Sequence, residues 1–162
     1  FITMRSGSKT FNIAGLKNAY VFTQNQEFHN RIDRQFNINE INDLPPFGIA
    51  ATVAAYNECD DWIVELNDYI QDNYKLLVKF FKENFPEVKV ASLESTYLAW
   101  VDCSCFKMSG TELKNTLLKK GKLYVNDCEM YMSPYPSFLR INLGCPRAYL
   151  EEALKRFKKA LG

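Results

Sequence analysis

The sequence lacks several features that would assign a function class directly. No apolar run approaches the about 20 residues needed to cross a bilayer, and no basic segment followed by an apolar one opens the chain. One histidine and five cysteines without C-x-x-C spacing do not predict a zinc site. The 20 basic and 19 acidic side chains are interspersed, which excludes a nucleic-acid or anionic-membrane footprint. We therefore expect a soluble, cytoplasmic protein with free thiols, no metal and a small-molecule or protein partner.

The content of the chain favours a folded α/β protein. At 162 residues, 47% hydrophobic and 14% aromatic, it is long enough for one core and a second small lobe. It begins at Phe1, without an initiator methionine, on apolar residues that are typical of a strand already under way. We therefore expect a fragment of a longer protein.

Hydrophobic patterns predict the elements of the first half. They favour strands at 1–4 and 20–23, an amphipathic helix at 28–36, a break at 44–48, a buried helix at 49–56 and a long helix at 61–86. A helix of this last length is suited to bridging two lobes.

The second half reads as a compact α+β lobe. Strands are expected at 88–90, 96–102, 123–125 and 138–143, a helix opened by a capping box at Ser109 and ending near Gly121, and a closing helix after Pro146.

Lys9 follows the first predicted strand in a turn of small, hydroxyl-bearing residues. A lysine amine becomes a nucleophile when burial or a nearby cation removes its proton. Ser6 and Ser8 offer hydroxyls that suit a phosphate. From these residues alone, a solvated surface lysine is the commoner interpretation.

Arg140 is the second candidate. In the alternation of 138–143, residues 138, 140 and 142 share one face and residues 139, 141 and 143 the other, so Arg140 lies with Asn142 on the more polar side. Arginine binds carboxylates through two parallel hydrogen bonds, which suits an amino-acid substrate, although an exposed strand arginine is the simpler interpretation. The lone His29 is expected at the surface. Four tyrosines fit either a pocket lining or ordinary packing: Tyr97, Tyr124, Tyr131 and Tyr135.

Four collinear segments carry a family resemblance. They are Ser6–Leu16 around Lys9, Pro46–Gly48 with the alanine-rich stretch after it, Ser95–Asp102 and Leu139–Arg147. Together they resemble the pyridoxal-phosphate (PLP) enzymes of the class I/II aminotransferases, fold type I, and most closely the cystathionine β-lyase branch of C–S lyases. The resemblance covers nearly the whole chain but only the C-terminal part of such enzymes.

This resemblance implies a fold and a set of roles. It predicts the end of the PLP-binding large domain at 1–60, an interdomain helix at 61–86 and a small α+β domain at 87–162. Lys9 would form the internal aldimine and move the Cα proton, with Ser6 and Ser8 near the cofactor phosphate. Arg140, Tyr97 and Asn142 would bind the amino-acid substrate. Homodimers are typical of such enzymes.

The resemblance also leaves alternatives open. Typical aminotransferases carry a phosphate-binding arginine where this chain has Lys17, which favours the C–S β-lyase branch over transamination. The family's upstream half, with the aspartate that pairs with the pyridine nitrogen, is not in the sequence. We therefore expect the isolated chain to be inactive and the N-terminal half to be its packing partner. The other alternative is a non-catalytic interaction domain that retains the fold.

Overall fold

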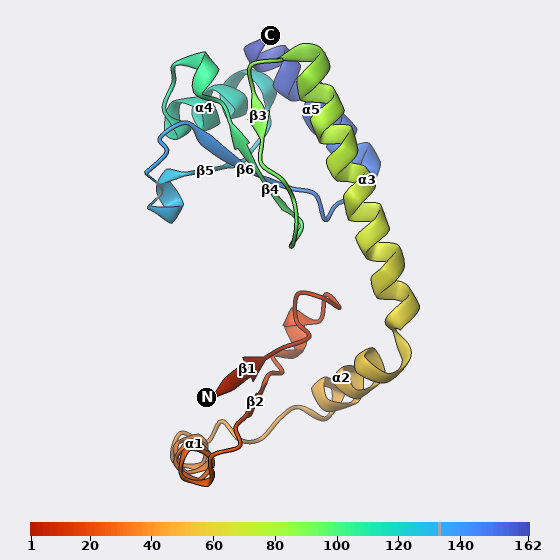
Figure 1. The fold of residues 1–162 in the computed structure, drawn as a ribbon, viewed down its shortest axis with the longest axis vertical. Coiled ribbons are helices and arrows are strands. Elements are labelled where there is room, and N and C mark those ends of the chain that lie inside the picture. The colour runs from red at the N-terminus through yellow and green to blue at the C-terminus, as the bar shows by residue number, and fades with distance from the viewer. Residues whose placement is uncertain (133) are drawn as a thin grey trace. The chain divides into compact units, whose positions relative to one another are not determined.

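The computed structural model describes residues 1–132 and 134–162, which divide into two compact units, Phe1–Leu66 and Asn67–Gly162. Strands and helices are mixed along the chain (Figure 1), as predicted for the α/β class. Among the described residues, no helix is both long enough and apolar enough to cross a membrane.

The first unit contains a short antiparallel ribbon and two complete helices. Its elements are β1 (Thr3–Arg5), η1 (Ala14–Leu16), β2 (Tyr20–Phe22), α1 (Gln26–Ile38), α2 (Pro46–Glu58) and the start of α3 (Asp60–Asn84). β1 pairs with β2, with Met4 opposite Val21. α1 begins where the Asn25 side chain accepts a hydrogen bond from the Phe28 N–H, which satisfies a free donor of the first turn. The predicted strand at 20–23 and the helix around Phe28 are confirmed.

α2 differs from the predicted helix in two respects. It begins at Pro46 rather than at residue 49, because the first helical position needs no N–H and tolerates the fixed φ of proline. It was also expected to be buried, but within its unit only Gly48 and Ala55 are buried and Phe47 is 80% exposed. An apolar sequence therefore does not by itself guarantee that a helix is covered.

The second unit is an antiparallel sheet with helices packed on it, which confirms the α+β prediction. Its elements are the rest of α3, β3 (Lys89–Val90), β4 (Leu98–Asp102), η2 (Ser104–Phe106), α4 (Gly110–Thr116), η3 (Leu117–Gly121), β5 (Asn126–Asp127), η4 (Glu129–Tyr131), β6 (Phe138–Asn142) and α5 (Arg147–Leu161). The strand order is β3-β4-β6-β5. α5 lies alongside the C-terminal half of α3 (Figure 1), where the Phe81 and Phe157 rings meet edge to face at 5.1 Å.

The helix boundaries of this unit follow the predicted signals. Ser109 accepts a hydrogen bond from the Glu112 N–H, and the Glu112 carboxylate accepts one from the Ser109 N–H, so the capping box is confirmed. Pro146 precedes the first residue of α5.

One predicted strand is wrong. Residues 123–125 form no ladder, and the strand lies instead at β5, where Asn126 is opposite Arg140. Val125 is buried nonetheless, and Leu123 lines a cavity beside α5. Apolar β-favouring residues indicate that a segment is buried rather than that it pairs with a strand, so the predicted strand lies a few residues from the observed one.

Candidate active site

The Lys9 loop connects β1 to β2 within the first unit. The Ser6 hydroxyl donates to the Asn18 carbonyl at 3.0 Å, and the Ser6 and Ser8 oxygens lie 2.5 Å apart. Because the single proton of Ser6 is used on Asn18, the Ser8 hydroxyl must be the donor of the second bond. The backbone N–H of Ser8 also donates to the Ser6 oxygen, at 3.1 Å. The loop therefore holds two hydroxyls together directly before Lys9.

The Lys9 side chain is exposed, and its amine makes no hydrogen bond or ion pair with residues 1–132 or 134–162. The turn that carries it is closed by the Phe11 N–H, which donates to the Gly7 carbonyl at 3.0 Å. Gly7 is buried, and an added Cβ would lie 3.2 Å from the Phe11 ring. The turn is therefore closely packed while its lysine remains available.

Asn18 ties this loop to α2. Its side-chain amide donates to the Gly48 carbonyl and to the Thr52 hydroxyl, both at 2.8 Å. Its own carbonyl accepts the Ser6 hydroxyl, so one residue links the helix to the serine pair. An added Cβ at Gly48 would lie only 3.1 Å from the Leu16 carbonyl oxygen, so any larger residue would require this segment to shift by a few tenths of an ångström.

Arg140 lies on β6 as the alternation predicts. Leu139 and Leu143 are fully buried, while Arg140 is half-buried on the opposite face with Phe138 and Asn142. Among the described residues the guanidinium has no carboxylate partner. A half-buried arginine without a carboxylate partner is suited to binding an anion from outside.

The Arg140 guanidinium lies over the ring of Tyr131, on η4. The Arg140 Cζ lies 4.7 Å from the ring centroid, a cation–π contact. The Asn126 side-chain amide donates to the Tyr131 hydroxyl at 3.0 Å, and the Trp100 ring meets the Tyr131 ring edge to face at 5.9 Å. Tyr131 therefore contacts both residues that lie opposite Arg140 on the neighbouring strands, Trp100 on β4 and Asn126 on β5.

Tyr97 and Asn142 meet at the turn that follows β6. The Tyr97 carbonyl accepts the Leu143 N–H at 2.7 Å, and the Asn142 side-chain oxygen accepts the Gly144 N–H at 2.8 Å. A Cβ at Gly144 would lie 3.3 Å from the Tyr97 ring, so the ring packs directly on the turn. The side-chain oxygen of Asn142 is thus used by the turn, which leaves its amide nitrogen as the group available to a ligand.

Asn73 is a site residue that the sequence prediction missed. It is fully buried in α3, and its amide donates to the Leu143 carbonyl at 2.9 Å and to the Cys145 carbonyl at 3.1 Å. Its oxygen accepts a hydrogen bond from the Arg147 guanidinium at 3.3 Å. Asn73 therefore fixes the end of the strand that carries Arg140. Its signal in the sequence is an amide in the helical stripe between Ile70 and Leu77.

The sequence prediction also missed an ion pair, Lys114 with Asp127, which supports the residues next to Arg140. The Lys114 ammonium lies 2.6 Å from the carboxylate of Asp127, whose side chain is only 4% exposed. The hydrogen bond from Lys114 lowers the pKa of Asp127, and the same bond raises the pKa of Lys114. The Asp127 carboxylate also accepts the Met130 N–H at 3.4 Å, so the pair joins α4 to the segment that carries Tyr131.

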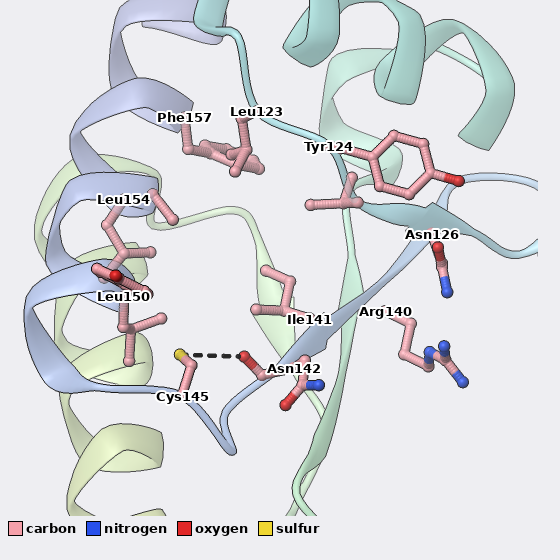
Figure 2. A pocket seen from close by; sticks show the side chains of 13 residues that line it. Leu123, Tyr124, Asn126, Arg140, Ile141, Asn142, Cys145, Leu150, Leu154 and Phe157 are labelled. Carbon is pink, nitrogen blue, oxygen red and sulfur yellow. Dashed lines mark hydrogen bonds between the residues drawn. The ribbon is translucent and has the colours of Figure 1, made fainter. Parts of the chain in front are cut away.

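A cavity of about 280 Å³ opens beside β6 in the second unit. Figure 2 shows an apolar lining from Leu150, Leu154 and Phe157 of α5, while the guanidinium of Arg140 points away from them. Burial raises the pKa of the Cys145 thiol, which donates to the Asn142 carbonyl at 3.7 Å. The thiol is thus a protonated structural donor, and the Arg140 guanidinium lies at the polar side of the cavity.

The sequence matches the family described as aminotransferase class I and II over residues 1–157. The chain belongs to the class I and II aminotransferase family. A cystathionine beta-lyase of Bacillus subtilis, PatB, is 33% identical to this family member over 99% of the chain and 41% of PatB.

Two solved structures of the same fold are also similar to this family member. Cystalysin from Treponema denticola, which contains a pyridoxal 5'-phosphate cofactor, superimposes with a TM-score of 0.92 at 29% identity, over 99% of this chain and 41% of that one. The PLP-bound C-S lyase from Staphylococcus hominis gives 0.85 at 30% identity, over 99% and 42%. The aminotransferase-family chain therefore spans about two fifths of the length of the relatives it matches.

Proposed function

We propose that the chain is the C-terminal part of a PLP-dependent enzyme that acts on sulfur-containing amino acids as a C–S β-lyase. The observation that carries the proposal is the Lys9 loop, in which an unpartnered amine directly follows two adjoining hydroxyls. Relatives named cystathionine beta-lyase and C-S lyase support the reaction class.

The donor set of the loop fits an aldehyde that carries a phosphate. The Ser8 hydroxyl, which donates to Ser6 in the free loop, would rotate to donate to a phosphate oxygen beside Ser6, and a primary amine is the group that condenses with an aldehyde. Lys9, Ser6 and Ser8 would therefore hold the cofactor.

Once bound, PLP would supply an electron sink for the Cα carbon of an amino acid. Lys9 Nζ would take the proton from Cα, and the Cβ–S bond would break with its electron pair leaving on sulfur. With one water consumed by hydrolysis, the products are a thiol, pyruvate and ammonia. The Arg140 guanidinium would bind the substrate carboxylate, and the Asn142 amide nitrogen and the Tyr97 hydroxyl would add donors beside it.

We propose that the isolated chain is inactive or nearly so. The chain spans about two fifths of the length of its relatives, and the Lys9 amine is exposed to solvent. We infer that the region equivalent to the rest of its relatives covers the apolar surface of the first unit, including Phe47 and Met4, each at least three-quarters exposed. A cytoplasmic homodimer of the complete enzyme is part of the proposal.

Borohydride trapping tests the cofactor site. The chain is incubated with PLP, reduced, digested and examined by peptide mass spectrometry for a pyridoxyl group. We expect labelling of the peptide with Lys9, its loss in Lys9→Ala and no change in Lys82→Ala, an exposed lysine on α3. Equal labelling of many lysines, unaffected by Lys9→Ala, would refute the assignment. Efficient pyruvate release from cystathionine by the chain alone would refute inactivity.

Transamination is the second candidate, because the matching family is named for it. A lyase releases a thiol and pyruvate from cystathionine, whereas an aminotransferase transfers the amino group to an added keto acid. Supplying the chain with the N-terminal region of PatB, PLP and both substrates separates the two reactions by their products. Formation of a new amino acid from the keto acid, without thiol release, would favour transamination.

A further inference from the structure

Arg140 is held by contacts that its proposed carboxylate-binding role does not itself require. A free arginine side chain rotates about several bonds, and ordering it costs conformational entropy on each binding event. Its guanidinium lies instead over the Tyr131 ring, with Cζ 4.7 Å from the ring centroid. A cation–π contact uses the charge of the guanidinium and not its five N–H donors, so donors remain available to a carboxylate.

The position of the Tyr131 ring is itself fixed from two sides. Its hydroxyl accepts the Asn126 amide at 3.0 Å, and Asn126 is the cross-strand partner of Arg140 on β5. Its ring also meets Trp100, the partner of Arg140 on β4. Both neighbours of Arg140 in the sheet therefore hold the tyrosine that covers it.

The segment that carries Tyr131 is anchored below by Asp127. The buried carboxylate binds Lys114 at 2.6 Å and accepts the N–H of Met130, the residue directly before Tyr131. η4 is thereby tied to α4, and the ring is not carried by a free loop.

We propose that Tyr131 is a positioning residue that orients the Arg140 guanidinium for a substrate carboxylate. This proposal rests on the proposed function of Arg140. Tyr131 holds the guanidinium over its ring and reduces the entropy lost when a carboxylate binds. Removing the ring should weaken carboxylate binding about two- to fivefold, the range expected for one partly exposed cation–π contact.

The experiment is NMR of the arginine Nε–Hε groups of the full chain, with the Arg140 signal assigned through Arg140→Lys. Wild type, Tyr131→Phe, Tyr131→Leu and Tyr124→Leu are compared, the last removing a more exposed tyrosine that lines the cavity together with Arg140. Each is titrated with propionate, with propionamide as the uncharged control. Far-UV circular dichroism of each variant checks that the fold is kept, which the 38% exposure of Tyr131 favours.

Three results support the proposal together. The ring-current shift and the restricted motion of the Arg140 Nε–Hε group disappear in Tyr131→Leu but persist in Tyr124→Leu. Propionate binding weakens two- to fivefold in Tyr131→Leu alone. Tyr131→Phe, which keeps the ring and loses only the bond to Asn126, lies between wild type and Tyr131→Leu.

An unchanged Arg140 signal in Tyr131→Leu would overturn the positioning role. A different failure is also distinguishable: if Arg140 depends on Tyr131 but propionate shifts it no more than propionamide does, the carboxylate role of Arg140 is refuted, and the positioning proposal falls with it. The Lys9 trapping experiment is independent of both outcomes.

Discussion

Replacing Asn73 by alanine should destabilise the second unit strongly. The substitution removes two donors and one acceptor from a fully buried side chain. It leaves the carbonyl of Leu143, a residue with no exposed surface, without the side-chain donor at 2.9 Å. The Cys145 carbonyl is lost as a partner too, although Cys145 is only half-buried and water reaches it more easily.

The magnitude follows from these contacts. An unsatisfied buried carbonyl costs about 1–3 kcal/mol, and the loss of a hydrogen bond to a more accessible group about 0.5–1.5 kcal/mol. Alanine returns about 0.6 kcal/mol of helix propensity relative to asparagine. The net loss in free energy of unfolding is about 1–4 kcal/mol. Asn73→Asp should cost at least as much at neutral pH, because a carboxylate would then face two carbonyl oxygens.

Urea unfolding followed by Trp100 fluorescence measures this loss. The Trp62→Phe background makes Trp100, on β4, the single tryptophan of the chain. The matched control is Asn67→Ala, an exposed asparagine on the same helix, which should be neutral or stabilise slightly. If Asn73→Ala unfolds at the same urea concentration as Asn67→Ala, the hydrogen bonds of the Asn73 side chain contribute nothing to stability and the reasoning is refuted.

Three further predictions concern the same unit. The pKa of Asp127 is lowered in the folded state, so its pair with Lys114 stabilises the fold above about pH 4, and this stability is lost as pH falls through the lower folded pKa. The stability of Asp127→Asn should therefore depend less on pH in acid unfolding than that of the wild type. Identical acid-unfolding profiles of the two proteins would contradict the pair. Gly121→Ala should cost about 1–3 kcal/mol in urea unfolding, because the new Cβ would lie 2.8 Å from the Arg156 carbonyl oxygen, and a neutral effect would show that α5 moves freely. Ser109→Ala should lower the free energy of unfolding by about 1 kcal/mol in the same assay, because the N-cap hydrogen bond is lost. A loss smaller than the error of the assay would show that this N-cap does not stabilise the fold.

Much of the second unit was predictable because its signals are local. The face that carries Arg140 follows from alternation within six residues, since successive strand side chains point to opposite sides. The start of α4 follows from the reciprocal bonds of Ser109 and Glu112, which need no residue outside the first turn. Such features depend on neighbours in the sequence, so a single sequence contains them.

The supports of Arg140 were not predictable for the opposite reason. Asn73 bonds to carbonyls 70 and 72 residues away, and Lys114 pairs with Asp127 across a helix and a strand. An amide in an apolar stripe and a carboxylate beside a strand indicate that partners exist, but not which ones. The position of β5 failed similarly, because pairing depends on where β6 lies rather than on the propensity of 123–125.

The two candidate groups differ in how completely their own unit prepares them. Arg140 has a guanidinium held over a tyrosine ring, a fixed strand end and an anchored neighbouring loop, all from residues within 67–162. Lys9 has a closed turn and two adjoining hydroxyls, but its side chain is exposed and its amine bonds to none of the described residues. Carboxylate binding at Arg140 should therefore be measurable in the chain alone, and so should imine formation between Lys9 and PLP, whereas catalytic turnover should need further protein around the amine. Detecting the reverse, pyruvate release by the chain alone beside an Arg140 that ignores carboxylates, would show that burial within each unit does not control the function of these groups.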